Sequence, residues 1–319
     1  MVSLESKFHG CLMGCGVGDA LGQPFEGKFG IHLRDIIDIT KFYRGIYTDD
    51  TQLTLAIAES LIRKEGFDPE DLGKRFAEWL DEPPIRPGFT CLSAAHKLLE
   101  GTSWKNSGIN SGANGAVMRI SPVGLYYRDN IKELIKVAQI SSEITHTHVG
   151  AYSSAIVIAR AVAYLTNNEE IHVDDFLNSL LDSIKGIKIE DFKEHIMSLK
   201  DYLNQKPIDA LMKIGLLGVK PPFYDSRMEG MGIIHPYACS TTLGALYSFL
   251  YYQDNYLKAV ELAVKGGGDT DTVGAICGAI AGAWNGIESI PKNLINNLRN
   301  NENITSAASN LYLLYRKKK

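Results

Sequence analysis

Helical periodicity runs along almost the whole chain and constrains its fold more than any other feature. Apolar residues recur every three or four positions, as at Leu53, Ile57 and Leu61, which is the spacing of one face of an α-helix. Alternating runs of Val, Ile and Thr, typical of half-buried strands, are scarce and short. The sequence therefore predicts an all-α protein. We expect helices near 4–22, from 49 to a stop at Gly66, from 69 onward, and at 90–100, 130–143, 147–165, 173–184, 239–252, 255–264, 270–285 and 306–315.

Three of these helical segments are rich in Gly, Ala and Ser: "GCLMGCGVGDALG", "GAYSSAIVIARAVAYL" and "TVGAICGAIAGAWNG". Small side chains allow helix axes to approach closely. We therefore expect these segments to form the buried centre, surrounded by the charged amphipathic helices.

The chain has 319 residues, of which 45% are hydrophobic, so it can bury a large core. No repeat, low-complexity segment or linker divides it, which favours one compact domain over residues 1–319. A net charge of -4 argues against a nucleic-acid-wrapping surface. Five scattered cysteines without a CxxC pair, no secretory signal and no apolar run of about 20 residues predict a cytoplasmic protein with no membrane partner. We expect a monomer.

Two helix starts carry more acidic residues than capping requires. Asp49 and Asp50 follow Thr48 in "YTDDTQL", and Asp269 and Asp271 open "DTDTVGAICG" after three glycines. One carboxylate at a helix start accepts free N–H groups and meets the positive end of the helix dipole. The second carboxylate at each start is surplus, although a solvated residue in the first turn is an ordinary alternative for either motif alone.

Hard divalent cations explain the surplus acids. Mg²⁺ and Mn²⁺ prefer carboxylate, hydroxyl and water oxygens, and two ions about 3.5–4 Å apart need several carboxylates. Without cations, such a cluster would repel strongly and some of its members would take up protons. No EF-hand loop is present, and His and Cys are absent from both motifs, which disfavours calcium and structural zinc. We expect two Mg²⁺ or Mn²⁺ ions with ligands Thr48, Asp49, Asp50, Asp269, Asp271 and Thr272.

Six motifs in this order resemble the ADP-ribosylglycohydrolase family, which includes the dinitrogenase reductase-activating glycohydrolases. They are "GCGVGDALGQPFE", "YTDDTQL", "SGANGAVMR", "ISPVGL", "THTH" and "GGGDTDTVGAICGAIAGAWNG". The resemblance implies a compact all-α fold with two metal ions at the base of a cleft, and hydrolysis of the glycosidic bond between ADP-ribose and an acceptor. It implies that the first Asp-Thr motif holds one ion and the second holds the other, with Asp271 as the bridging ligand.

The resemblance also implies roles for individual residues. Glu26 matches an acidic residue of a mobile loop, although a surface Glu beside a Pro turn is the alternative. The catalytic set implied is Glu26, Asp49, Asp50 and Asp271. The substrate-binding set implied is Ser111, Gly112, Asn114, Gly115 and His146, with Tyr237 and Met231 as weak candidates for an adenine wall. Asp19 is expected to tie helix ends together, His148 to cap a helix, and Arg119 to contact ligand or form a buried ion pair.

One departure concerns the acceptor. Relatives that release ADP-ribose from arginine often carry an acidic residue shortly before the glycine that aligns with Gly88, whereas this chain has Arg86 there. A cation is a poor partner for a guanidinium leaving group, so serine-linked, O-acetylated or other conjugates stay open. The expected substrate is an ADP-ribosylated protein, with nucleic acid only as a modified substrate. The alternatives are an inactive ADP-ribose-binding or crystallin-like member and a two-metal phosphohydrolase.

Overall fold

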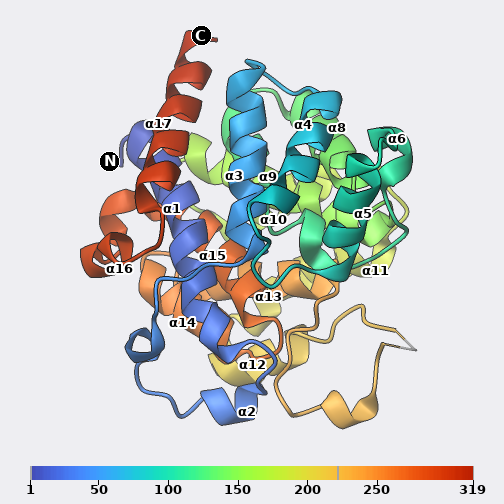
Figure 1. The fold of residues 1–319 in the computed structure, drawn as a ribbon. Coiled ribbons are helices and arrows are strands. Elements are labelled where there is room, and N and C mark those ends of the chain that lie inside the picture. The colour runs from blue at the N-terminus through green and yellow to red at the C-terminus, as the bar shows by residue number, and fades with distance from the viewer. Residues whose placement is uncertain (1, 221–222, 319) are drawn as a thin grey trace.

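The structure, a computed structural model, describes residues 2–220 and 223–318 and is built from helices (Figure 1). The all-α prediction is confirmed: the described residues form no sheet, and their β-type pairings are isolated bridges. The α-helices are α1 (Leu4–Gly22), α2 (Gly30–Leu33), α3 (Asp49–Arg63), α4 (Pro69–Glu78), α5 (Phe89–Leu99), α6 (Trp104–Ser107), α7 (Ser121–Tyr126), α8 (Ile131–Glu143), α9 (Val149–Asn167), α10 (Val173–Ser183), α11 (Glu190–Tyr202), α12 (Pro207–Ile214), α13 (Ala238–Tyr251), α14 (Tyr256–Lys265), α15 (Thr270–Asn285), α16 (Lys292–Asn296) and α17 (Asn301–Lys317).

Helices α1 and α15 form the centre of the fold and pack antiparallel through glycines. A Cβ atom on Gly14 would lie 2.3 Å from the carbonyl oxygen of Gly278, and one on Gly278 would lie 2.1 Å from that of Gly14. At the end of this seam, a Cβ atom on Gly22 would lie 2.0 Å from the carbonyl oxygen of Thr270. The backbones thus touch where any side chain would clash, which confirms the buried role predicted for these small-residue segments.

The remaining helices surround this pair. Helices α3 and α17 pack on α1, helices α13 and α14 pack on α15, and α9 lies between α15 and the group α7, α8 and α10. Among the described residues, α9 alone is long and apolar enough to cross a membrane, and 78% of its apolar window is buried inside the fold. Helix α9 is therefore a buried helix of the protein core.

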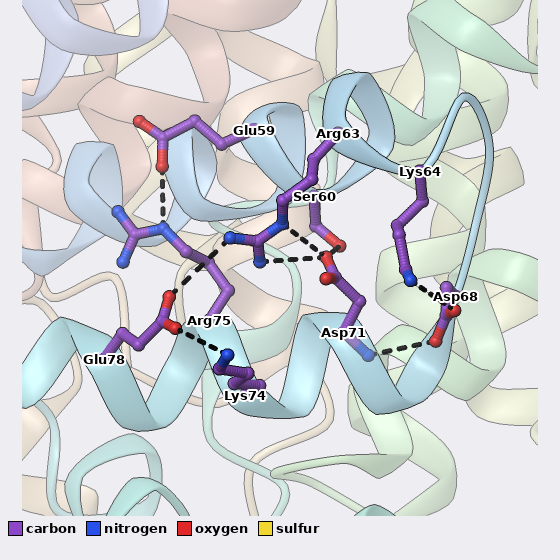
Figure 2. Close-up of polar contacts among 9 residues, drawn as sticks. All are labelled: Glu59, Ser60, Arg63, Lys64, Asp68, Asp71, Lys74, Arg75 and Glu78. Atoms are coloured by element: carbon purple, nitrogen blue, oxygen red, sulfur yellow. Dashed lines mark hydrogen bonds and ion pairs between the residues drawn. The ribbon is translucent and has the colours of Figure 1, made fainter.

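Polar contacts join α3 to α4 (Figure 2). Arg63 donates to Asp71 over 3.0 Å, and Arg75 donates to Glu59 on α3 over 2.7 Å. Arg75 also donates to Glu82, just beyond α4, over 2.6 Å. These contacts fix the start of the loop that returns from α4 toward the beginning of α3.

Loops from distant parts of the chain gather where α1 ends and α15 begins, at the lower end of α1 in Figure 1. Isolated bridges join these loops in pairs. The bridged pairs are Phe29 with Gly267, Ile234 with Gly268, Ala113 with Tyr237 and Ile109 with His146. These bridges therefore bring together the segments that carry the motifs "SGANGAVMR", "THTH" and "GGGDTDTVGAICGAIAGAWNG".

Candidate metal and substrate site

The two acidic motifs meet at Asp50. Thr48 caps α3, and its hydroxyl donates to the Asp50 carboxylate over 2.9 Å. The Thr272 hydroxyl, from the first turn of α15, donates to the same Asp50 oxygen over 3.3 Å. Asp50 is 2% exposed, and its other oxygen, Oδ1, has no hydrogen-bond partner in the described structure. The site therefore contains a buried oxygen that is free to accept a cation.

Asp49 lies beside Asp50 and is held by the loop that follows α4. Its backbone N–H donates to the carbonyl oxygen of Ile85 over 2.9 Å, and the Gly88 N–H donates to its carboxylate over 3.2 Å. Burial, with added repulsion from Asp19 and Asp269, raises the pKa of Asp49 to about 8. Holding its charge at neutral pH thus requires a nearby positive charge.

Asp269 and Asp271 complete the acidic cluster from the α15 side. The Asp269 carboxylate accepts a hydrogen bond from the Asn114 amide over 2.7 Å, and the Asp271 carboxylate accepts one from the Thr272 N–H over 3.0 Å. Burial, followed by the charges of Asp269 and Asp50, raises the pKa of Asp271 well above its ordinary value. Burial, followed by Asp19 and Asp49, does the same to the pKa of Asp50. The four predicted carboxylates therefore act on one another in one cluster, in which Asp49, Asp50 and Asp271 are buried and Asp269 is partly exposed.

These residues fit hard divalent cations by donor chemistry. The donors are carboxylate and hydroxyl oxygens, one buried oxygen is unpartnered, and the carboxylates crowd without a buried cation between them. Within residues 2–220 and 223–318, however, no three His, Cys, Asp or Glu side chains already form a group that could hold a metal ion. The carboxylates instead accept hydrogen bonds from neighbouring N–H and hydroxyl groups.

Asp19, on α1, ties α1 to the start of α3, as expected from the sequence. It is fully buried and accepts hydrogen bonds from the Thr48 N–H over 3.0 Å, the Thr51 N–H over 3.2 Å and the Thr51 hydroxyl over 2.6 Å. Burial raises its pKa to about 7. Asp19 thus fixes the first turn of α3 from α1, and with it the direction of Asp49 and Asp50.

Glu26 follows the end of α1, and its carboxylate pairs with the guanidinium of Arg86. Its charge is felt at Asp271, where it contributes to the raised pKa. Glu26 therefore lies at the rim of the acidic site rather than on a remote surface turn. The sequence identified Arg86 only as a departure from relatives and gave no signal that it pairs with Glu26.

The predicted substrate loop, residues 111–115, borders the cluster through Asn114. The Asn114 amide donates to the Thr241 hydroxyl over 3.1 Å as well as to Asp269. Ser111 lies on the side of α5, where its hydroxyl contacts the Thr90 hydroxyl over 3.0 Å. The loop therefore runs from the start of α5 to the start of α15.

The glycines of this loop are required by close packing. A Cβ atom on Gly112 would lie 2.8 Å from the Tyr237 ring, and one on Gly115 would lie 2.5 Å from the Cys91 sulfur and 2.8 Å from the His146 ring. Gly115 is itself buried. The backbone thus passes over these side chains at distances that leave no room for one of its own.

His146 lies beneath the loop rather than on an open surface. It is fully buried, its Nδ1 shares a hydrogen bond with the Thr145 hydroxyl over 2.8 Å, and its Nε2 has no hydrogen-bond partner in the described structure. Burial, reinforced by Arg119, lowers the pKa of His146 to about 3. The imidazole is therefore neutral at physiological pH.

Of the other residues singled out in the sequence, Tyr237 and His148 lie at the substrate loop, whereas Met231 lies near α2 and Arg119 is buried in the core. Tyr237 packs beside His148 at the substrate loop, with ring centroids 6.3 Å apart, and His148 caps α9 as expected. Met231 lies by α2, where its carbonyl oxygen accepts a hydrogen bond from the Ile31 N–H over 3.1 Å. Arg119 is fully buried and donates to the Thr145 hydroxyl over 2.7 Å. Its contacts are therefore structural, though made to neutral groups rather than in an ion pair.

A cavity of about 660 Å³ is lined by α3, by the loop that carries Arg86 and by the segment around the start of α17. Its lining includes Gln52 and Glu59 of α3, Arg86 of the loop, and Arg299 and Asn300 before α17. None of the predicted metal ligands lines it. Arg86 is therefore shared between this cavity and the rim of the acidic site.

Fold and site together define an all-α protein whose central helix pair carries a buried carboxylate cluster beside a glycine loop. Comparison with known proteins places it further. A sequence profile of the ADP-ribosylglycohydrolase family matches residues 1–319. The chain belongs to this family.

Individual relatives agree with this assignment. The chain is 28% identical to the ADP-ribosylhydrolase ARH3 of Gallus gallus, over 97% of this chain and 94% of that protein. It is 25% identical to the ADP-ribosyl-[dinitrogen reductase] glycohydrolase of Rhodospirillum rubrum, over 93% of this chain and 91% of that one. A solved structure titled "ADP-ribosylglycohydrolase-related protein complex" superposes with a TM-score of 0.74 at 24% identity, over 99% of this chain and 100% of that one, which confirms the fold. The family and the names of these relatives support a glycosidic-bond hydrolase.

Proposed function

We propose that this protein is a metal-dependent hydrolase that cleaves the glycosidic bond between ADP-ribose and an acceptor. The observation that carries the proposal is the meeting of Asp50 and Thr272, because it draws the acidic motifs of α3 and α15 into one buried site. The metal ions belong to the proposal through the donor chemistry of that site. An inactive binding protein is not favoured, because all six expected ligand residues are present.

The two halves of the site would hold one Mg²⁺ or Mn²⁺ ion each. Thr48, Asp49 and Asp50 would hold the first, and Asp269, Asp271 and Thr272 the second, with Asp271 shared between them. When bound, the ions supply positive charge that polarises water and ribose hydroxyls. They also neutralise the carboxylates that otherwise repel one another.

The chain's own residues handle the proton and the sugar. Water attacks the anomeric carbon of the ribose, and the bond between this carbon and the acceptor atom breaks. Positive charge develops on the sugar ring in the transition state. Glu26, whose charge acts on Asp271, would accept the proton from the water and return it to the leaving group. The carboxylates of Asp49, Asp50 and Asp271 would hold the ions that orient the ribose hydroxyls and the attacking water.

The loop at residues 111–115 would bind the diphosphate and ribose. The Ser111 hydroxyl and the Gly112 N–H, both partly exposed, would be the donors for phosphate oxygens. The Ala113 and Asn114 N–H groups already donate to the Ser111 hydroxyl and the Pro236 carbonyl, so the buried Gly115 would act by shaping the loop. Asn114 holds Asp269 and so couples this loop to the metal site. His146, neutral and buried under Gly115, supports the loop from behind.

The charge of Arg86 favours a neutral acceptor. Its guanidinium lies at Glu26, at the side of the acidic site, and would repel the guanidinium of an arginine acceptor. We therefore propose an oxygen-linked conjugate, such as serine-linked or O-acetylated ADP-ribose, as the substrate class.

The test is release of free ADP-ribose from arginine-linked, serine-linked, O-acetylated and nucleic-acid-linked conjugates, each with Mg²⁺, with Mn²⁺ and with a chelator. We expect release from an oxygen-linked conjugate that stops when the chelator is added. Thermal stabilisation by ADP-ribose without release from any conjugate would show a binding protein, and release of inorganic phosphate from nucleotides would show a phosphohydrolase.

A further inference from the structure

Arg86 joins the two loops on either side of the acidic site. Its Nη1 donates to the backbone carbonyl of Gln23 over 3.2 Å and to the Glu26 carboxylate. With the Gln23 amide turned to satisfy its hydrogen bonds, the Gln23 side-chain oxygen accepts from Arg86 Nε over 3.2 Å and from Nη2 over 3.1 Å. Every one of these acceptors belongs to the segment that follows α1, so one guanidinium holds that segment as a unit.

The backbone of Arg86 indicates that its side chain is needed at this position. Arg86 has φ +52°, in the left-handed region, where glycine is the least strained residue. A glycine two positions later, Gly88, has φ −65° and open space around it, so it could carry a side chain. The contacts of the guanidinium offset the strain that the Arg86 backbone carries.

The loop that carries Arg86 is fastened to the start of α3. The Ile85 carbonyl accepts from the Asp49 N–H over 2.9 Å, and the Gly88 N–H donates to the Asp49 carboxylate over 3.2 Å. The Gln52 side chain accepts from the Ile85 N–H over 3.0 Å. Arg86 therefore extends from a segment whose position is set by Asp49 itself.

The segment after α1 is fastened on its other side to the glycine loop before α15. The Gly27 N–H donates to the Gly268 carbonyl over 2.8 Å, and the Gly268 N–H donates to the Lys28 carbonyl over 2.8 Å. Glu26 lies between these hydrogen bonds and the contacts of Arg86. Loss of the guanidinium would remove the ties to the loop that carries Arg86 and leave the segment held by the glycine loop and by the buried Phe25 side chain.

We propose that Arg86 is a positioning residue that latches residues 23–28 over the acidic site and sets where the Glu26 carboxylate lies relative to Asp49 and Asp271. The inference rests on the proposed function for the role of Glu26. The Arg86 and Glu26 side chains are 47% and 39% exposed, so the pair is weakened by salt and can open. The latch is therefore reversible, as a loop that admits substrate requires.

Hydrogen exchange of the metal-free full chain tests the latch without any need for activity. The variant is Arg86→Gly, because glycine suits the left-handed backbone and removes only the side chain. We expect amide exchange at Gly27 and Lys28 to accelerate about threefold to tenfold, since the segment opens locally more often. Arg86→Lys, which keeps the charge but not the fork of donors, should recover part of the protection.

A matched control comes from the α3–α4 contacts in Figure 2. Arg63 is 43% exposed and pairs with Asp71 and Glu78, so Arg63→Ala removes a similar ion pair elsewhere. Exchange at Gly27 should stay at the wild-type rate in this variant. Raising NaCl from about 0.05 M to about 0.5 M should accelerate exchange at Gly27 in the wild type and leave Arg86→Gly unchanged.

Unchanged exchange in Arg86→Gly, or an equal acceleration in Arg63→Ala, would overturn the latch. With a hydrolysed substrate in hand, Arg86→Gly should lower kcat with little change in KM, because Glu26 is displaced while the substrate loop is intact. If no conjugate is hydrolysed, the proposed function fails and the exchange result still stands. If hydrolysis is observed but exchange at Gly27 does not change, the latch alone fails.

Discussion

Thr272 and Asp50 are 222 residues apart in the sequence, and the Thr272 hydroxyl donates to the Asp50 carboxylate over 3.3 Å. Each residue lies in the first turn of its helix, and each is buried. The contact therefore aligns two helix starts, so that the positive ends of two helix dipoles meet at the same group of carboxylates. We therefore expect substitutions of these carboxylates, and the addition of divalent cations, to change stability and activity chiefly through the contact between these two helix starts.

Asp271→Asn should abolish ADP-ribose release while leaving the helical fold intact. The substitution keeps the size of the side chain and removes a carboxylate proposed to be shared by two ions. We expect kcat/KM to fall at least about 100-fold, a loss of about 2.7 kcal/mol of transition-state stabilisation. Circular dichroism checks the fold, and Asp174→Asn, at an exposed residue paired with Lys200, is the control. Full activity in Asp271→Asn would count against a two-ion site.

Mg²⁺ or Mn²⁺ should raise the melting temperature of the wild type. A ligand that binds the folded state stabilises it by about 2.7 kcal/mol at a concentration 100 times its Kd. The buried Asp50 oxygen without a partner is one expected point of binding, so Asp50→Asn should lose most of the shift. Differential scanning calorimetry with the metals and with a chelator measures the effect. Equal shifts in the two proteins would place the ion elsewhere.

Gly14→Ala should destabilise the fold strongly. Its Cβ would lie 2.3 Å from the Gly278 carbonyl oxygen, so α1 and α15 must move apart along the seam. We expect a loss of about 3 kcal/mol in the free energy of unfolding, at the upper end for overpacking. Gly88→Ala, where a Cβ meets nothing within 4 Å, should change stability by about 0.5 kcal/mol or less. Urea unfolding of both variants checks the contrast.

Asp19→Ala should weaken metal binding although Asp19 is not an expected ligand. It removes the acceptor of the Thr48 and Thr51 groups, and unpaired buried donors cost about 1–3 kcal/mol. The first turn of α3 then loses its support from α1, so the magnesium-induced rise in melting temperature should shrink. Calorimetry of the variant with and without Mg²⁺ measures both effects. A smaller stability with an unchanged magnesium effect would limit Asp19 to the fold.

The acidic clusters were predictable from the sequence, because helix capping cannot account for two acids at each helix start. In the structure neither helix uses an acid as its cap: the Thr48 hydroxyl caps α3, and the Asp269 side chain makes no capping hydrogen bond at α15. The acids of the two motifs lie together, since, after burial, Asp269 helps to raise the pKa of Asp50 and Asp50 helps to raise that of Asp271. The fold class and the central helices were also predictable, because the helical spacing of apolar residues and the runs of small residues can be read from short stretches of sequence. Helix α17 begins at Asn301 rather than near residue 306 because its first turn carries polar residues without an apolar pattern.

Contacts between distant loops were not predictable in this way. Glu26 and Arg86 are 60 residues apart, and nothing in either local pattern pairs them. The burial of His146 under Gly115 likewise depends on where α9 and the substrate loop pack, although the sequence shows only a histidine near a helix start. Helices α11 and α12 lie in a segment whose mixed polarity hid their periodicity.

The glycine seam between α1 and α15 also sets a register. Its contacts recur every four residues on both helices, from Gly10 with Gly282 to Gly18 with Gly274. A slide of four residues, about 6 Å, would restore glycine against glycine but carry Glu26 away from Asp271. The hydrogen bond of 2.8 Å from the Thr270 hydroxyl to the Gly22 carbonyl, where the two backbones approach closely, favours the observed alignment over the shifted one. The alignment of α1 with α15 in the core thus sets how far Glu26, after the end of α1, lies from Asp271, in the first turn of α15.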